Sequence, residues 1–197
     1  MTVFVALDQG TTSSRAVVFD QSGRMLASHS IELKQIYPKP GWVEHNPDEI
    51  LSGQIEALRT AVRLSGVNIN EIAAIGITNQ RETTLLWDKA TGECLHNAIC
   101  WQCRRTASYV ERLVAEGQAE TIRQKTGLVP DAYFSGTKLA YLLDTLNVYE
   151  RAGRGELCFG TVDTFLAWNL VEGRPHVTDA TNARNVSTVR SEEHTSE

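Results

Sequence analysis

Residues 6–15, ALDQGTTSSR, join an apolar strand to one carboxylate and a turn rich in glycine, threonine and serine. Gly10 lets the backbone approach a ligand closely, and the hydroxyl and N–H groups of residues 11–14 can bind anionic oxygens. Mg²⁺ keeps much of its water and takes few carboxylate ligands, so Asp8 is a candidate to bind it through water. The spacing is not that of a Walker A loop. A hairpin with a solvated polar turn is the alternative that this segment alone leaves open.

A second polar segment, TNQRETT at residues 78–84, follows a continuous apolar run at residues 72–77. In α/β proteins, ligand-binding groups are placed where a buried strand ends. Arg81 and Glu82 are neighbours there, and a guanidinium beside a carboxylate can satisfy polyol hydroxyls, which both donate and accept. An exposed ion pair is the alternative for this dipeptide alone.

Two aromatic residues could complete such a site. Trp101 follows an apolar run, and its indole could form a wall against the carbon backbone of a ligand. Tyr133 lies in a loop before a predicted helix, and its hydroxyl could reach a substrate. A core tryptophan and a hydrophobic staple are the respective alternatives, so neither residue decides the function.

Cys100 and Cys103 have the C-x-x-C spacing of a redox dithiol, and with Cys94 and His96 nearby they could also form a metal site. Zinc would need a second ligand pair at a defined spacing, and Cys158 stands alone. We interpret the pair as small, buried, reduced thiols at the end of an apolar strand.

The composition is that of a globular chain: of 197 residues, 42% are hydrophobic and 22% are charged, and the net charge is −5. This charge offers no basic surface for nucleic acid. The N-terminal apolar run is too short for a signal peptide or a membrane span. We therefore expect a cytoplasmic protein with no nucleic-acid partner and no membrane insertion.

The N-terminal third is expected to form a meander and then a helix. Strands over residues 3–7, 15–19 and 25–33 predict an antiparallel meander. A proline-containing loop over residues 36–45 is expected to cross the surface. A helix should follow over residues 46–66, with Asn46 as its cap, Pro47 at its first position and Gly66 at its end. Its apolar face is predicted to comprise Leu51, Ile55, Leu58 and Val62.

The remainder mixes strands with helices. The apolar run at residues 72–77 predicts a strand covered on both faces and central in a sheet. Further strands are expected over 83–87 and 98–101, and helices over 106–116, 120–126, 137–146 and 161–170. The pattern predicts an α/β fold with a mixed sheet.

Six segments, in this order, resemble the FGGY carbohydrate kinase family: LDQGTTSSR, IYPKPGWVEH, AAIGITNQRETT, WQCRRT, YFSGTK and GTVDTFLAW. The resemblance spans about residues 3 to 183. TNQRETT, WQCRR and YFSGTK resemble the glycerol kinases of that family in particular. The resemblance implies the actin-like, ribonuclease-H-like ATPase fold. It also implies that residues 1–189 are an incomplete N-terminal, substrate-binding domain of a two-domain kinase.

The implied reaction transfers the γ-phosphoryl group of ATP to a terminal hydroxyl of glycerol, giving sn-glycerol 3-phosphate, chiefly by positioning and charge neutralisation. The resemblance implies ATP and Mg²⁺ as cofactors, with Asp8 near the metal, and a homo-oligomer for the full-length protein. The residues implied to contact phosphate are Thr11, Thr12, Ser13 and Arg15. Those implied to contact glycerol are Arg81, Glu82, Trp101 and Tyr133.

The chain also departs from the family. The general base of the family is an aspartate in a later G-D-Q-Q segment, which these residues lack, so no catalytic base is expected here and the chain alone is expected to be inactive. A catalytically dead glycerol-binding fragment and a kinase for another polyol or sugar are the alternatives. Tyr141 stands where the family signature usually has tryptophan. Residues 190–197, RSEEHTSE, resemble the translation of a sequencing adapter and are expected not to be native.

Overall fold

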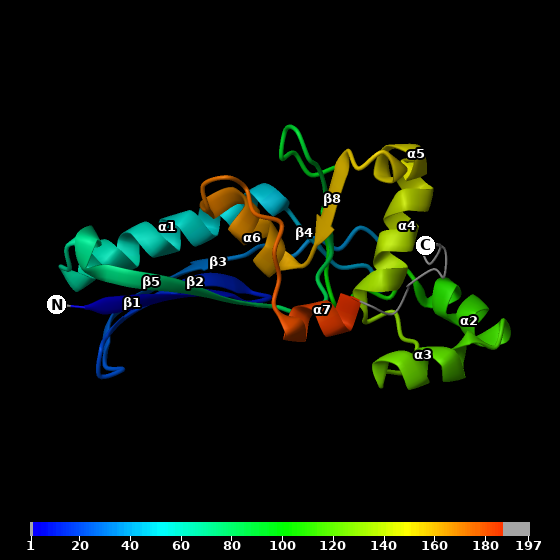
Figure 1. Cartoon of the computed structure of the whole chain (residues 1–197), viewed down its shortest axis with the longest axis horizontal. Coiled ribbons are helices and arrows are strands. Elements are labelled where there is room, and N and C mark those ends of the chain that lie inside the picture. The colour runs from blue at the N-terminus through cyan, green and yellow to red at the C-terminus, as the bar shows by residue number, and fades with distance from the viewer. Residues whose placement is uncertain (1, 187–197) are drawn as a thin grey trace, which may run out of the picture.

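The structure, a computed structural model, describes residues 2–186. Figure 1 shows a long sheet covered by one helix at the N-terminal side, followed by a part built of shorter strands and helices. The segment 190–197 that was expected to be non-native lies outside the described residues, as do the last three residues of the expected domain 1–189.

The larger sheet is mixed. Its strands are β1 (Val3–Gln9), β2 (Ser13–Asp20), β3 (Met25–Glu32) and β5 (Ile72–Asn79), in the order β3-β2-β1-β5. The first three pair antiparallel, and β5 pairs parallel to β1. The predicted meander and mixed sheet are therefore confirmed. Because β1 and β5 are parallel, their C-terminal ends meet at the same edge of the sheet.

Helix α1 (Pro47–Ser65) covers this sheet and begins and ends as predicted. The Asn46 side chain accepts a hydrogen bond from the Asp48 N–H at 2.8 Å. Gly66 closes the helix in the left-handed region with φ 69°, a conformation that glycine adopts without a steric penalty.

The buried face of α1 differs from the predicted one. Its fully buried positions include Ile50, Ala57 and Ala61, whereas Leu51 and Leu58 are only partly buried. Small side chains at the centre of the face let the helix lie close to β2 and β3, and the larger residues pack at its margins. The apolar pattern identified the helix but misplaced the line of closest approach.

Gly53 marks that closest approach, because a Cβ atom there would lie 3.1 Å from Ser14 Oγ of β2. Replacing Gly53 by valine is expected to lower the free energy of unfolding by about 1–3 kcal/mol, since the added methyl groups push α1 away from the sheet. Chemical denaturation measures this change. Arg59→Val puts the same β-branched residue at an exposed position of α1 and should change stability much less; equal losses in both variants would contradict the proposed contact.

Strand β5 is not the central, covered strand that the sequence predicted. Among the described residues it pairs with β1 alone, and most of its side chains are exposed, Ile75 to 48%. Helix α6 (Val162–Leu170) packs near its end at Ile77. A continuous apolar run predicts a central strand with cover on both faces. Within residues 2–186, β5 is instead an edge strand, and its faces are largely uncovered.

The proline-containing loop crosses the surface as predicted at Tyr37 but then enters the core. Glu44 and His45 are buried and form β4 (Glu44–His45), which pairs with β7 (Ala98–Ile99). The Glu44 carboxylate accepts a hydrogen bond of 2.6 Å from the buried Arg105 guanidinium. A buried cation requires a partner, and this ion pair draws the end of the loop inward.

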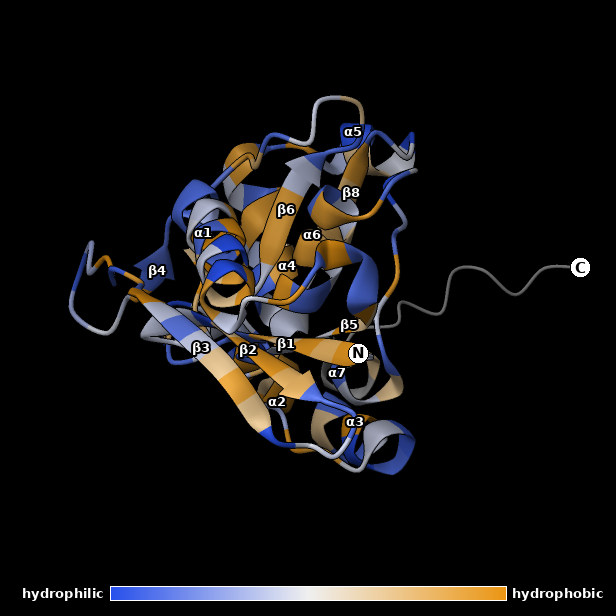
Figure 2. Ribbon diagram, turned by 90° about the vertical axis from the view of Figure 1, so that its left-hand side faces the viewer, coloured by the Kyte–Doolittle hydropathy of each residue, from blue (hydrophilic) through white to orange (hydrophobic). Residues whose placement is uncertain are grey.

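The second part of the structure is organised around the pair β6 (Leu85–Asp88) and β8 (Leu157–Gly160), which run antiparallel. The Trp87 ring on β6 lies edge-on to Phe165 and Trp168 of α6. Figure 2 shows hydrophobic residues along β1, β2 and β6, which form the interior of the two parts.

The four predicted helices of this part are present: α2 (Ala107–Ala115), α3 (Gln118–Thr126), α4 (Ser135–Leu146) and α6. The sequence did not predict β8 or three short elements: η1 (Ile69–Glu71), α5 (Tyr149–Gly153) and α7 (Ala180–Val186). Among residues 2–186, none of the helices combines the length and the apolar content needed to cross a bilayer.

Candidate active site

The turn after β1 and the polar segment after β5 lie side by side. The Gln80 N–H donates to Gln9 O at 2.7 Å, and Gln80 Nε2 donates to Gly10 O at 3.2 Å. The parallel register places Asp8 beside Thr78. The two segments that the sequence singled out for chemistry therefore share one edge of the sheet.

Hydrogen bonds join these segments to Trp101 and form a closed ring. Gln80 Oε1 accepts from Thr83 Oγ1 at 3.0 Å, and Thr83 Oγ1 accepts the Trp101 backbone N–H at 3.1 Å. The Trp101 indole Nε1 then donates to Thr11 Oγ1 at 3.0 Å. Since Gln80 also contacts Gly10, the ring returns to the turn where it began.

The turn itself is fixed from inside. The Gly10 N–H donates to Ser13 O at 2.9 Å, and a Cβ on Gly10 would lie 3.3 Å from that oxygen. The fully buried Gln9 side chain accepts from Ser14 Oγ at 2.8 Å. These contacts argue against a merely solvated hairpin turn, because they hold the backbone in one shape.

The predicted phosphate residues surround this turn with different exposures. Thr12 and Arg15 are exposed, while Asp8, Thr11 and Ser13 are half-buried. Asp8 on β1 lies opposite Arg15 on β2. As directly opposed residues of neighbouring strands, these two side chains share one face of the sheet, next to the hydroxyl-rich turn.

Glu82 is held in a strained conformation by its surroundings. It is 2% exposed and has φ 64°, which is rare for a residue other than glycine. Its backbone oxygen accepts from Thr84 Oγ1 at 3.1 Å, Ser135 Oγ at 3.2 Å and Lys138 Nζ at 3.3 Å. These three hydrogen bonds to one carbonyl offset the strain and fix the Glu82 backbone, and with it the position of the Glu82 Cβ atom.

The four residues predicted to contact the polyol are brought together. Burial raises the pKa of the Glu82 carboxyl, against the lowering effects of a Tyr133 hydrogen bond and the Arg81 charge. Burial, and then the interaction with Glu82, raises the pKa of Tyr133 to about 12, so its hydroxyl remains a donor. The Trp101 and Tyr133 rings lie edge to face with centroids 5.6 Å apart.

Arg81 also lines a polar hollow of about 300 Å³ beside the end of β5. Asn79 borders it from the strand, Asp179 from the residue before α7, and Asn182 from α7 itself. The hollow adjoins the ring of hydrogen bonds, because Arg81 follows Gln80 directly.

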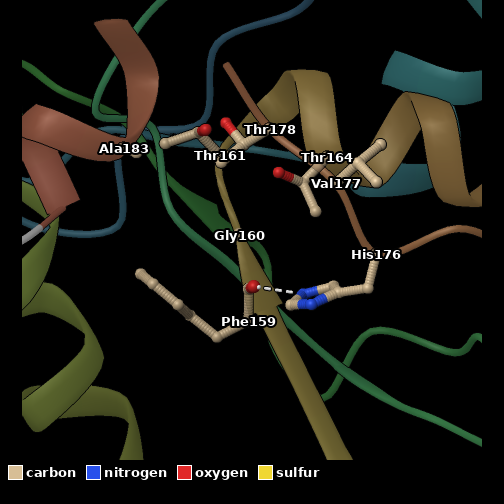
Figure 3. A pocket seen from close by; sticks show the side chains of 8 residues that line it. All are labelled: Phe159, Gly160, Thr161, Thr164, His176, Val177, Thr178 and Ala183. Carbon is tan, nitrogen blue, oxygen red and sulfur yellow. Dashed lines mark hydrogen bonds between the residues drawn. The ribbon is translucent and has the colours of Figure 1, made fainter. Parts of the chain in front are cut away.

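A separate apolar cavity of about 230 Å³ lies between β8, α6 and the segment before α7 (Figure 3). His176 borders it and donates from Nε2 to Phe159 O at 2.8 Å. None of the residues predicted to bind phosphate or polyol lines this cavity.

Cys100 and Cys103 are buried thiols, as the sequence predicted; Cys158 is also buried, whereas Cys94 is half-buried. Burial raises the pKa of Cys100, and Cys103 Sγ accepts from Arg105 Nε at 3.0 Å. Among residues 2–186, no group of three or more histidine, cysteine or acidic side chains is arranged to hold a metal ion.

The sequence did not predict Gln80, Thr83 or Lys138 as residues of the site, although they lie in the motifs TNQRETT and YFSGTK. For Gln80 and Thr83 the available signal was their place beside Arg81 and Glu82 after an apolar strand. For Lys138 the signal was a lysine next to Leu139 at the start of an amphipathic helix, where the residue is completely buried.

The sequence profile of the FGGY family of carbohydrate kinases, N-terminal domain, matches residues 3–190. The chain belongs to the FGGY family of carbohydrate kinases. This FGGY domain is 58% identical over 180 residues to a glycerol kinase of Caldanaerobacter subterraneus subsp. tengcongensis, and 56% identical over 184 residues to glycerol kinase 2 of Thermotoga maritima. The matches cover 91% and 93% of the chain but 36% and 37% of these relatives. The chain thus spans little more than a third of their length.

Solved structures agree with this membership. The FGGY domain resembles the crystal structure of Plasmodium falciparum glycerol kinase with ADP at a TM-score of 0.87 and 31% identity, over 94% of this chain and 37% of that one. It resembles a xylulose kinase from Lactobacillus acidophilus at a TM-score of 0.80 and 24% identity, over 94% of this chain and 36% of that one, a likeness of fold. The expected actin-like, ribonuclease-H-like α/β fold is confirmed.

Proposed function

We propose that this domain is the substrate-binding part of an ATP-dependent kinase that phosphorylates a terminal hydroxyl of glycerol. The observation that carries the proposal is the hydrogen bond from Trp101 Nε1 to Thr11 Oγ1. It joins the candidate polyol pocket to the candidate phosphate turn, and phosphoryl transfer requires its two reacting groups to be held together. The names of the bacterial relatives support glycerol as the acceptor.

Each polyol residue has a distinct role in this proposal. The Arg81 guanidinium donates to hydroxyl oxygens, and the Glu82 carboxylate accepts from hydroxyl protons. Tyr133 orients Glu82 and borders the ligand together with the Trp101 ring. A triol of three carbons offers both the donors and the acceptors that this set requires.

The turn after β1 would meet the nucleotide phosphates. Thr11, Thr12 and Ser13 supply hydroxyl and N–H donors, and Arg15 supplies a positive charge. Thr11 accepts from the indole, so its own proton points away from Trp101 and can be donated to a phosphate oxygen. The Plasmodium relative, whose structure contains ADP, supports an adenine nucleotide as a ligand of this kinase.

The donor set at this turn fits Mg²⁺. A magnesium ion in kinases is held by one or two carboxylates and by phosphate oxygens, with water in its other positions. Asp8 supplies one carboxylate beside the hydroxyl-rich turn. When bound, the ion neutralises charge on the transferred phosphoryl group.

The catalytic base is proposed to come from outside these residues, in the G-D-Q-Q segment of the family. The proposal also includes a cytoplasmic location and a homo-oligomer for the protein of the complete reading frame. It includes no nucleic-acid partner and no membrane insertion, consistent with the net charge of −5.

The test is a turnover assay with glycerol and MgATP. We expect no product from residues 1–197 and sn-glycerol 3-phosphate from the protein of the complete reading frame. Appreciable turnover by residues 1–197 would overturn the placement of the base. The same assay with a panel of polyols and sugars tests the substrate, and a preference for a pentulose would overturn glycerol.

A further inference from the structure

Lys138 is a completely buried lysine in the first turn of α4. Its Nζ donates to three backbone oxygens, those of Tyr133, Phe134 at 3.5 Å and Glu82 at 3.3 Å. An ammonium group has three protons, and each acceptor here is a carbonyl of the main chain. The lysine therefore serves the backbone of two segments rather than a single acidic partner.

The two segments carry the two candidate polyol residues that contact each other. Glu82 follows β5, and Tyr133 lies 51 residues later, before α4. Their side chains interact, since each perturbs the pKa of the other. Lys138 donates hydrogen bonds to the backbone oxygens of both residues, and so fixes the distance between their backbones.

Burying a lysine costs free energy, because the ammonium group loses its water and must find other hydrogen-bond partners. Burial lowers the pKa of Lys138 to about 8, against the opposing influence of nearby Cys100, Cys103, Glu82 and Asp131. An apolar side chain of the same length would avoid this desolvation, as in buried ion pairs replaced by hydrophobic residues. Unlike an apolar side chain, the ammonium group donates a hydrogen bond to the Glu82 backbone oxygen. This bond helps to stabilise the strained backbone of Glu82.

We propose that Lys138 is a positioning residue for polyol recognition, whose ammonium group fixes the spacing between Glu82 and Tyr133. The inference rests on the proposed function, because it assigns Lys138 to the polyol site of that kinase. Lys138 acts through the two residues and does not touch the polyol itself.

The test uses the protein of the complete reading frame. Lys138→Met removes the donors while keeping a side chain of similar length, and we expect the KM for glycerol to rise about tenfold or more as polyol hydrogen bonds lengthen. The KM for ATP should stay within about twofold, because the phosphate turn is held by the separate ring through Gln80. Steady-state kinetics with each substrate varied in turn measures this split.

Thr137→Val is the matched control in the same turn of α4. The buried Thr137 hydroxyl bonds to Thr106 at 2.9 Å and not to Glu82, so the KM for glycerol should be unchanged. Ser135→Ala removes another donor to Glu82 O without altering a charge, and a smaller rise in the same KM is expected.

Thermal melting followed by circular dichroism shows whether each variant folds. If Lys138→Met does not fold, Ser135→Ala carries the test, together with Lys138→Ala assayed with and without n-propylammonium. That cation can fill the vacated space and should restore the KM for glycerol, whereas n-propanol, with one donor, should not.

A folded Lys138→Met protein with the wild-type KM for glycerol would overturn the inference. An equal rise in KM for glycerol and ATP would overturn it as well, since it would indicate general damage. If the wild-type protein does not phosphorylate glycerol, the proposed function fails instead. The same variants are then compared with the substrate that the panel identifies.

Discussion

Replacement of Glu82 by glutamine is expected to lower kcat/KM for glycerol by about 100-fold or more, because a hydrogen bond to a charged group contributes about 1.5–3 kcal/mol and the carboxylate can accept more than one. Glutamine has nearly the same shape, so the pocket should keep its form. Its amide nitrogen replaces an acceptor with a donor where the polyol presents hydroxyl protons. Steady-state kinetics of the protein of the complete reading frame measures the loss.

Two controls separate this effect from instability. Glu111→Gln makes the same change on an exposed position of α2 and should leave kcat/KM unaltered. Glu82→Gln itself is expected to melt at the same or a higher temperature, since it removes a buried charge whose desolvation raises its pKa. A kcat/KM within about threefold of wild type would rule out the assigned acceptor role.

The raised pKa of Glu82 also fixes a direction for pH dependence. The ionised carboxylate is the acceptor, so kcat/KM for glycerol should fall as the pH drops through the raised pKa, above the ordinary value of 4.5. Glu82→Gln should lack this acid limb. For stability the sign is opposite: the folded state binds this proton more tightly than the unfolded chain, so this group lowers stability as the pH rises from 4.5 through the folded-state pKa.

Replacement of Asp8 by asparagine is expected to lower kcat by about 100- to 1,000-fold with little change in the KM for glycerol, because a metal ion supplies several kcal/mol of charge stabilisation in phosphoryl transfer. The half-buried carboxylate stands at the end of β1, opposite Arg15. Its loss leaves the turn without a negative group to hold hydrated Mg²⁺. Initial rates over a Mg²⁺ titration measure the change, and a higher Mg²⁺ requirement should accompany the lower kcat.

Asp20→Asn is the comparison for this variant. Asp20 lies at the far end of β2, where its carboxylate accepts from Ser22 and Arg24 of the hairpin turn. Removing that charge is expected to leave kcat and the Mg²⁺ dependence unchanged. An Asp8→Asn protein with the same Mg²⁺ titration as wild type would contradict the metal assignment.

Local signals in the sequence predicted much of the fold. Apolar stretches separated by short polar turns predicted β1 to β3. A capping asparagine, a first-turn proline and a terminal glycine predicted both ends of α1. These signals act over a few residues, so they are visible in sequence. The strand expected over residues 98–101 contains β7, but β4 was not predicted, and no local pattern specifies that these two short strands pair with each other.

The site was predicted as a set of residues but not as a structure. Thr11 and Trp101 are 90 positions apart, and their hydrogen bond depends on the parallel pairing of β1 with β5. The left-handed backbone of Glu82 is equally hidden, since glutamate gives no signal for a positive φ. Both features depend on tertiary contacts that single-sequence patterns do not encode.

The indole of Trp101 limits how this domain could evolve to bind other sugar substrates. Replacing Trp101 by a smaller residue to admit a bulkier sugar would also remove the indole donor from Thr11, so it would disturb the proposed phosphate turn at the same time. Laboratory evolution toward longer substrates should therefore accumulate changes around Tyr133 first and retain the tryptophan.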